Sequence, residues 1–528
     1  MSELVEDTAS AFTEPAGSLP GAARDKGLRG GALGLVSNVV IGMSSTAPAY
    51  SIAATLGLLV LAGTGVKAVA FVVVAFLPIV FVSFAFRELN SVEQDCGTNF
   101  TWAARAFGSR TGWMVGWAVT IAQLLVMTSQ SAITGRYTLL LFGLDSLADN
   151  KLVTTSVGSV WLLGLCYLCY RGIEISAKVQ WCLLGIELSI LAIFSVVALV
   201  RVYSGTAGPQ ALHVSWSWFW PSGIGLGAFV SATLLAVFIY WGWESSLSIN
   251  EESADPAHAP GKAAVLSTVL LVGNYLLITI AAVAFAGVGE TGIGLGNKDN
   301  SEDVLAGLGH AVFGSGGWGQ VFGALLVISV LTSGAASSQA TIMPAARTTL
   351  SMAWHGALPT VFGRVHPVYR TPSVSTWAFG GVALALYIGL TVLSENVLSD
   401  SVDAVGLAIA VEYGMTALSC VWVFRRTLRS SWRNLMMRGV LPGLGALFFG
   451  LVLVAAVIEY AQPDSGATTV FGIGGVAVIG MASILVGVPL MALIYRSCRD
   501  YFEGRALPKG VVLPGGDTIE TRPEAIRR

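Results

Sequence analysis

Apolar runs of about 20 residues, the length at which an α-helix crosses a bilayer, recur along nearly the whole chain. Only 11% of the 528 residues are charged, whereas a soluble domain carries about a quarter. Because lipid leaves backbone groups without water partners, such runs must fold as helices. The sequence therefore predicts an all-α polytopic membrane protein with 12 transmembrane helices, near 33–62, 68–86, 111–142, 152–170, 179–200, 224–248, 263–288, 318–346, 373–393, 402–424, 440–461 and 469–495.

The positions of the basic residues predict the orientation of these helices. An even number of spans places both termini on one side of the membrane. The opposite side keeps only five of the 29 Lys and Arg residues, and the other 24 share the side of the termini. Since basic loops stay in the cytoplasm, we expect a multi-pass protein of the cell (cytoplasmic) membrane with both termini cytoplasmic. The five exceptions are Lys67, Arg136, Lys151, Arg201 and Lys298.

The segment 37–51, SNVVIGMSSTAPAYS, interrupts the first apolar run with hydroxyl residues, a glycine and a proline. Gly42 adds backbone freedom and Pro48 lacks an N–H donor, so both favour a helix break. Broken backbone at membrane depth persists only where protein covers it or where it lines a wet cavity. We therefore predict a discontinuous helix 1 whose freed amides and hydroxyls bind substrate, through Ile41, Gly42, Met43, Ser44, Ser45, Thr46 and Ala47.

A second polar and aromatic cluster interrupts the sixth apolar run. The residues Tyr240, Trp241, Gly242 and Trp243 precede Glu244 there. If helices 1 and 6 are both discontinuous, they begin the two halves of a five-plus-five inverted repeat. Half-helix N-termini attract a carboxylate and aromatic faces attract an ammonium group, so the two breaks together suit a zwitterion. Neighbouring aromatic residues cannot all face one cavity, and we favour Trp241 for the pocket.

The repeat divides the chain into five parts. These are a disordered cytoplasmic tail, a first five-helix repeat, a second five-helix repeat, helices 11 and 12, and a second cytoplasmic tail. The expected ranges are 1–31, 32–205, 222–426, 438–498 and 499–528.

Several ordered motifs resemble those of the amino acid, polyamine and organocation (APC) transporter superfamily. The segment 251–260, EESADPAHAP, is similar to the superfamily's EE...P...P segment after helix 6. Glu88-Leu89 followed by 97–108 resembles its EL...GG-Y-Y...AFG pattern, and 171–180 and 347–372 are similar to two further links.

The resemblance implies an APC/LeuT-like fold and a proton- or sodium-coupled importer or exchanger of amino acids or related amines. It places the substrate α-carboxylate at the helix 1 break and the α-amine near the helix 6 break. The segment Gly42-Met43-Ser44 departs from the superfamily's common G-S-G form at the first break.

Three acidic residues, Glu187, Glu244 and Glu412, fall within predicted spans, where a functional role is the default expectation. Glu187 stands where, by the resemblance, several members carry a lysine whose ammonium replaces a sodium ion. Desolvation favours the neutral carboxyl form, which would make Glu187 a proton carrier. An ionised Glu187 would instead help to hold Na⁺ with Ser333, Ser337 or Ser338 of helix 8. We favour proton coupling.

The other coupling or gating candidates keep structural alternatives open. Glu244 is expected to accept hydrogen bonds from the broken segment, either as a protonatable gate or as a brace. Glu412, beside Tyr413, is either functional or one partner of a packed hydrogen-bonded pair. The hydroxyls of Ser333 and Ser337 either face the ion site or bond carbonyls of their own helix.

The sequence thus predicts a secondary active amino acid permease that works by alternating access. Its expected partners are a small-molecule substrate, a proton or sodium ion, and membrane lipid. A polyamine or other amine transporter, a sodium-coupled transporter and a transporter-like solute sensor are the alternatives. All five histidines lie in loops or at span edges, so an embedded enzyme gains little support. We expect no catalytic site, cofactor, metal or nucleic acid.

Overall fold

The computed structural model describes residues 26–298, 304–314, 316–393, 400, 404–463 and 465–510. Helices make up about three quarters of this part of the chain, as the apolar runs predict. The long helices are α4 (Ala68–Asn90), α6 (Ser109–Leu141), α8 (Lys151–Arg171), α9 (Ile173–Tyr203), α12 (Ala259–Ala286), α14 (Gly317–Trp354), α15 (Ser373–Leu393), α17 (Val405–Phe424) and α19 (Leu441–Tyr460).

Shorter pieces connect or interrupt these helices. The short α-helices are α2 (Leu35–Ser45), α3 (Pro48–Leu59), α5 (Asn99–Phe107), α7 (Asp145–Ala148), α10 (Leu226–Phe238), α11 (Ser245–Ser248), α13 (Val304–Phe313), α18 (Trp432–Asn434), α20 (Gly475–Leu485), α21 (Gly487–Ile494) and α22 (Arg499–Phe502). Tighter or wider turns are η1 (Val60–Thr64), η2 (Gly65–Lys67), η3 (Trp216–Phe219), η4 (Asn250–Glu252), η6 (Thr360–Gly363), η7 (Leu428–Ser430) and η8 (Leu435–Val440).

The predicted spans coincide with helices, with three differences. Ten helical stretches of the described chain are long and apolar enough to cross a membrane, and the first of them, Leu35–Asn90, joins predicted spans 1 and 2. Predicted span 6 contains only a shorter apolar helix, Leu226–Phe238. Predicted span 12 begins with an antiparallel hairpin, β1 (Thr469–Val470) and β2 (Ile473–Gly474), so its helix begins at Gly475. The protein is therefore a multi-pass all-α membrane protein, and the count of 12 crossings stays a prediction.

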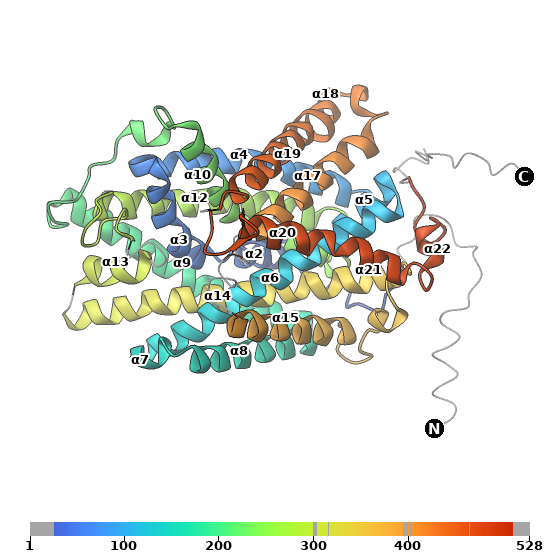
Figure 1. Cartoon of the computed structure of the whole chain (residues 1–528), viewed down its shortest axis with the longest axis horizontal. Coiled ribbons are helices and arrows are strands. Elements are labelled where there is room, and N and C mark those ends of the chain that lie inside the picture. The colour runs from blue at the N-terminus through green and yellow to red at the C-terminus, as the bar shows by residue number, and fades with distance from the viewer. Residues whose placement is uncertain are drawn as a thin grey trace, which may run out of the picture.

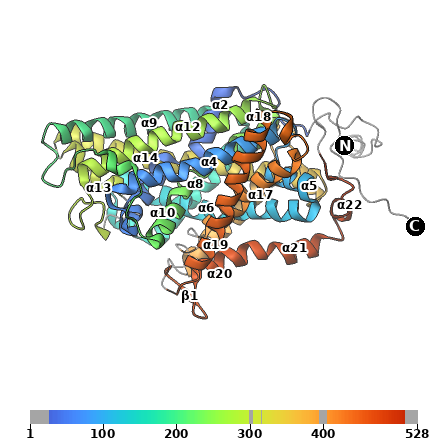
Figure 2. The same ribbon diagram turned by 90° about the horizontal axis from the view of Figure 1, so that it is seen from above.

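Most long helices run side by side along the long axis of the molecule (Figure 1). The helix α14 packs against α6, α9 and α15, and α12 packs against α4 and α9. The last two helices, α20 and α21, lie along one edge of the bundle against α6 (Figure 2). The broken helices run through the interior, since α2 and α3 both pack against α12 and α14.

Both ends of the described chain lie at the same end of the bundle. Lys26 bonds to Asp95 in the loop before α5, and the Gly510 amide donates to the Arg105 carbonyl of α5 at 3.0 Å. Residues 26–31 and 499–510, which we assigned to tails, are thus held against the bundle. The Tyr501 hydroxyl, for example, donates to the Ser109 carbonyl at 2.8 Å.

Glycine permits the closest helix crossings, in agreement with the 62 glycines of the chain. At Gly158 in α8, an added Cβ would overlap the backbone oxygen of Ser131 in α6 and lie 2.8 Å from the hydroxyl of Tyr387 in α15. At Gly164, six residues later in the same helix, an added Cβ would meet nothing within 4 Å. The two positions therefore separate the effect of packing from the effect of helix propensity.

The Gly158→Ala variant is expected to lower the free energy of unfolding by about 1–3 kcal/mol, because backbone atoms cannot move aside for the methyl group. The Gly164→Ala variant is the control, and it should leave stability unchanged or raise it, since alanine is the better helix former. Thermal unfolding in detergent, followed by tryptophan fluorescence, measures both. Equal melting temperatures for the two variants would contradict this account of the α6–α8 crossing.

Candidate functional site

Helix 1 breaks between Ser45, the last residue of α2, and Pro48, the first of α3. Ala47 has φ of 47°, a left-handed conformation that is uncommon for a residue with a Cβ. Proline fits the first position of α3 because its missing N–H would have no helical partner there. The predicted discontinuity is thus present, at the proline end of the segment 37–51.

The amides of this break find partners within the protein. The Thr46 amide donates to the Met43 carbonyl at 3.2 Å, and the Ala47 amide to the Ser44 carbonyl at 3.1 Å. The Ser44 hydroxyl, in contrast, is buried without a hydrogen-bond partner. In this arrangement the amide donors of Thr46 and Ala47 are therefore occupied by carbonyls of the protein itself.

Glu187 of α9 lies at the N-terminus of α3. The Ala49 amide donates to Glu187 Oε1 at 2.7 Å, and the next amide, that of Tyr50, donates to the Ser333 hydroxyl at 3.3 Å. Glu187 is fully buried, and its Oε2 has no hydrogen-bond partner. None of the described ion pairs involves it. A helix N-terminus carries partial positive charge, so it is the neighbour that an isolated carboxylate prefers.

Helix α14 contributes two of the three predicted serines to the break. Besides Ser333, the Ser337 hydroxyl donates to the Ser45 carbonyl at 2.7 Å and accepts from Gln130 Nε2 of α6 at 2.5 Å. Ser338 instead bonds the Gly334 carbonyl of its own helix at 2.7 Å, the structural alternative we gave for these hydroxyls.

Helix 6 breaks between α10 and α11, and Gly242 lies there with φ of 117°. The Tyr240 hydroxyl donates to the Val72 carbonyl of α4 at 2.9 Å, so this side chain packs away from the break. Trp243 packs against Phe86, with ring centroids 5.0 Å apart. The indole N–H of Trp241 donates to Glu412 Oε2 at 3.3 Å.

The two breaks touch each other. The hydroxyls of Ser45 and Ser245 lie 2.8 Å apart. An added Cβ at Gly42 would lie 2.9 Å from the Trp243 carbonyl oxygen, and one at Gly242 would lie 2.9 Å from the Ser45 carbonyl oxygen. The structure thus brings the two predicted substrate-binding segments together, and glycine at both positions permits the contact. Ile41 through Ala47 and Tyr240 through Trp243 are all buried.

Glu244 and Glu412 join the helix 6 break to α17 by reciprocal hydrogen bonds. Glu412 accepts from Trp241 and, at 2.6 Å, from Asn99 Nδ2 of α5. Glu244 Oε2 accepts from the Tyr413 hydroxyl at 2.6 Å and from the Gly242 amide at 3.2 Å. All four donors are neutral. Glu412 is buried and Glu244 is partly buried, and neither has a cationic partner among the described residues. Ionising both neighbouring carboxyl groups is therefore costly, so the arrangement favours a proton on at least one of them.

Sequence reasoning missed Gln130 and Asn99 as members of this site. Gln130 lies in the middle of a long apolar helix, and a buried amide side chain in a membrane helix is itself a signal of an internal hydrogen bond. Asn99 lies in α5, which we treated as part of a loop motif.

Comparison with known proteins agrees with this architecture. The sequence profile of the amino acid permease family matches residues 32–500. The branched-chain amino acid permease BcaP of Bacillus subtilis is 26% identical over 422 residues, covering 74% of this chain and 82% of that protein. An arginine/ornithine antiporter of Latilactobacillus sakei is 24% identical, with 80% and 86% covered. The low-affinity putrescine importer PlaP of Escherichia coli is 24% identical, with 72% and 79% covered.

These relatives are transporters, and the family profile extends over nearly all of the described bundle, including both breaks. The profile match, the multi-pass helical fold and the two discontinuous helices lead to one assignment. The chain belongs to the amino acid permease family, within the APC transporter superfamily.

Proposed function

We propose that this protein is a proton-coupled permease of the cytoplasmic membrane that imports or exchanges amino acids by alternating access. Family membership supports transport as the activity. The relatives are named as transporters of branched-chain amino acids, of arginine and ornithine, and of putrescine. The permease is proposed to have both termini in the cytoplasm, supported by the basic residues and by the shared position of Lys26 and Gly510 at one end of the bundle.

One observation carries the proposal, namely the hydrogen bond from the Ala49 amide to Glu187. The N-terminus of α3 is a natural anion site, because its first amides lack helical partners and its dipole is positive. The carboxylate of Glu187 fills that site. A substrate carboxylate that binds at the helix 1 break needs the same donors, so it competes with Glu187.

Protonation of Glu187 resolves the competition. A neutral carboxyl group is a weaker acceptor than a carboxylate, so it releases the Ala49 amide more easily. Proton binding therefore favours substrate binding, and by linkage the substrate favours the proton to the same extent. Two ligands that promote each other's binding cross the membrane in the same direction, which is symport.

Sodium coupling is the second candidate for the ion. Glu187 and the Ser333 hydroxyl both face the first turn of α3, and oxygen ligands of this kind suit a hard cation. In that case Glu187 stays ionised throughout transport, so a pH gradient alone would drive no accumulation.

An amine without a carboxylate is the second candidate for the substrate. The buried Glu412 and the partly buried Glu244 lie beside Trp241, and neutral donors hold both carboxyl groups. An ammonium group would find both charge partners and an aromatic face there. This candidate predicts that substrate carboxylates contribute nothing to binding, whereas competition with Glu187 predicts that they are required.

Purified protein in liposomes is expected to accumulate labelled amino acids when the outside is acidic, because the proton moves inward with the substrate. A panel of amino acids, their decarboxylated amines and putrescine measures the importance of the carboxylate. Accumulation driven by Na⁺ alone would reject proton coupling but keep the fold assignment. Tight binding without flux under any gradient would identify a sensor.

The Glu187→Gln variant is expected to lose accumulation driven by the pH gradient while it keeps exchange of substrate across the membrane. Glutamine is neutral like the protonated acid, so the α3 N-terminus stays open to substrate but no proton is carried. Substrate affinity should fall with rising pH in the parent and stay constant in the variant, as binding measurements would show.

The matched control is Glu174→Gln, which lies in the same helix. Glu174 forms an exposed ion pair with Arg29, with the two side chains 43% and 53% exposed. Such surface pairs contribute about 0–1 kcal/mol, so this variant should transport like the parent. Accumulation that survives in Glu187→Gln would remove Glu187 from the coupling mechanism.

A further inference from the structure

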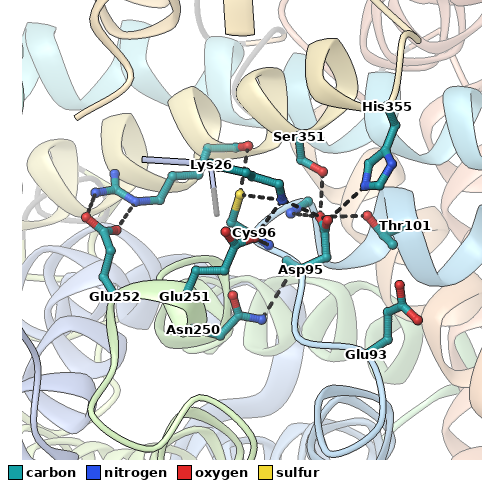
Figure 3. A network of polar contacts seen from close by, with 12 residues as sticks. Lys26, Glu93, Asp95, Cys96, Thr101, Asn250, Glu251, Glu252, Ser351 and His355 are labelled. Atoms are coloured by element: carbon teal, nitrogen blue, oxygen red, sulfur yellow. Dashed lines mark hydrogen bonds and ion pairs between the residues drawn. The ribbon is translucent and has the colours of Figure 1, made fainter. Parts of the chain in front are cut away.

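Lys26 lies in an anionic site at the end of the bundle that carries both described chain ends (Figure 3). Its ammonium group is 2.6 Å from Glu251 Oε1, 2.8 Å from Asp95 Oδ2 and 3.5 Å from the Cys96 sulfur. The Lys26 side chain is only 4% exposed. A residue that precedes the first membrane helix is thus inserted into the protein as a buried cation.

The site around Lys26 is built from two separate parts of the chain. Asp95 and Cys96 come from the loop between α4 and α5, whereas Glu251 comes from the turn η4 that follows helix 6. The ligand atoms of these three residues all lie within 4.8 Å of one another. Glu251 also accepts from the Cys96 amide at 2.8 Å. Without a cation between them, the two carboxylates would repel each other.

Further contacts extend the site to α14. Asp95 Oδ1 accepts from the Ser351 hydroxyl, and Asp95 Oδ2 lies 2.9 Å from His355 Nε2 (Figure 3). Next to it, Arg347 forms a two-bond ion pair with Glu252, at 2.5 and 2.9 Å, with both side chains buried. The turn η4 is therefore held to α14 by the Glu252–Arg347 pair and to the loop before α5 through Glu251 and Lys26.

The segment after Lys26 completes the cover. The Leu33 amide donates to the Glu252 carbonyl at 3.1 Å, and the Ala254 amide donates to the Leu33 carbonyl at 2.9 Å. This short parallel bridge ties the N-terminal segment to η4 immediately before α2 begins. The described N-terminal segment thus spans the end of helix 6 and reaches the loop before α5.

These contacts adjoin the halves of the broken helices that extend toward this face. The halves of the broken helices on this side are α2 and α11, and both pack against α14 as well as against each other. A substrate that leaves the breaks toward this face must separate α2 and α11 from α14. The Lys26 site holds together the segments that flank this separation.

We propose that Lys26 acts as a tethered cation that latches the cytoplasmic side of the permease, and that it must leave the Asp95–Glu251 site before that side opens. The assignment to the cytoplasmic side rests on the orientation given under the proposed function. The latch itself rests only on the contacts of Lys26. The group bound in the Asp95–Glu251 site is therefore part of this chain. Release of substrate to this side requires that the segment with Lys26 first leaves the site.

Both partners of the latch are ionised in the closed arrangement. Burial by itself lowers the pKa of Lys26, but the carboxylates of Asp95 and Glu251 raise it well above its usual value. Burial raises the pKa of Asp95, but Lys26 and His355 lower it well below its usual value. Each charge is thus stabilised by the other, and loss of Lys26 leaves Asp95 and Glu251 without the cation between them.

The Lys26→Ala variant is expected to open the cytoplasmic side more often. The readout is the labelling rate of thiols by a membrane-impermeant maleimide, resolved by mass spectrometry, with Cys182→Ser and Cys498→Ser in every protein. Cys96 reports on the latch, and a Ser44→Cys substitution places a second reporter at the helix 1 break. Both sites should label about tenfold faster in Lys26→Ala, since one partner of a buried ion pair is gone.

Three outcomes decide the proposal. Faster labelling of both reporters in Lys26→Ala, but not in the control Arg29→Ala on the same segment, supports the latch. Faster labelling of Cys96 alone would show that Lys26 holds only its own segment, and it would overturn the latch. No change at either site would also overturn the latch. Loss of Lys26 removes an attraction that lowers the pKa of the Cys96 thiol, so faster labelling there must come from access and not from reactivity.

Two additional measurements remove the remaining ambiguities. If Lys26→Ala does not fold, Glu251→Gln tests the same site, and the same outcomes apply to it. Labelling in vesicles of both orientations tests on which side of the membrane the latch lies, independently of whether the latch exists. Faster labelling from the opposite face would reject the cytoplasmic assignment while it keeps the latch.

The latch is expected to be insensitive to pH between about 6 and 8. The stabilisation from Asp95 is present above the ordinary carboxyl pKa and is lost only as pH falls through its lowered value. The stabilisation from Lys26 is present below the ordinary amine pKa and is lost only as pH rises through its raised value. The Cys96, Glu251 and His355 groups also face this site.

The ratio of labelling rates between Lys26→Ala and its parent tests this prediction. The change of thiol reactivity with pH is common to both proteins, so it cancels in the ratio. We expect equal ratios at about pH 6 and pH 8. A ratio that approaches one at either pH would show that the ion pair is lost there and would contradict a latch made of fixed charges.

Discussion

The absence of water from a bilayer interior forces this protein to satisfy the backbone of two broken helices with its own groups. At the helix 1 break, the Thr46 and Ala47 amides turn back to carbonyls of α2. The Ala49 and Tyr50 amides reach Glu187 and Ser333 of two other helices. The break is therefore a junction of α2, α3, α9 and α14, and a change in the charge of Glu187 acts on all of them. The proposed coupling site therefore coincides with a structural junction, because the same hydrogen bonds would serve both.

The three carboxyl groups at membrane depth differ in their partners, and the partners define what each can do. Glu187 faces a helix N-terminus, and in the proposed mechanism it competes with the substrate carboxylate for the amides of α3. Glu244 and Glu412 face only neutral donors and each other across the helix 6 break, which favours retention of a proton. Because the Ser45 and Ser245 hydroxyls join the two breaks at 2.8 Å, movement at one break is transmitted to the other. Proton binding at either place thus acts on the same pair of discontinuous helices.

The sequence was sufficient for the features that depend on residue type alone. Pro48 and Gly242 stand at the two breaks, as their residue types favour, and a run of apolar residues spans lipid whatever its neighbours are. Partners far apart in the chain were not predictable, since the choice of Asn99 for Glu412 or Gln130 for Ser337 depends on how the helices pack. Residues 26–31 were assigned to a disordered tail on composition, and composition cannot show that Lys26 meets two carboxylates 69 and 225 residues away. The sequence predicted a helix break at Gly242, but it could not predict that Gly242 packs against Ser45 of the other break.

The polar networks at the chain-end face and at the helix breaks differ in the charges of their members, and this difference suggests different roles. At the chain-end face, Lys26 with Asp95 and Arg347 with Glu252 are pairs of opposite charge, so each charge stabilises the other. Such pairs respond to displacement but hardly to protons. At the breaks, carboxyl groups meet only amides, hydroxyls and an indole, so a proton is the charge that balances them. In the proposed mechanism the permease therefore binds its coupling ion at the breaks and holds its closed face with fixed charges, so that ion binding changes occupancy of the site without itself breaking the ion pairs of the latch.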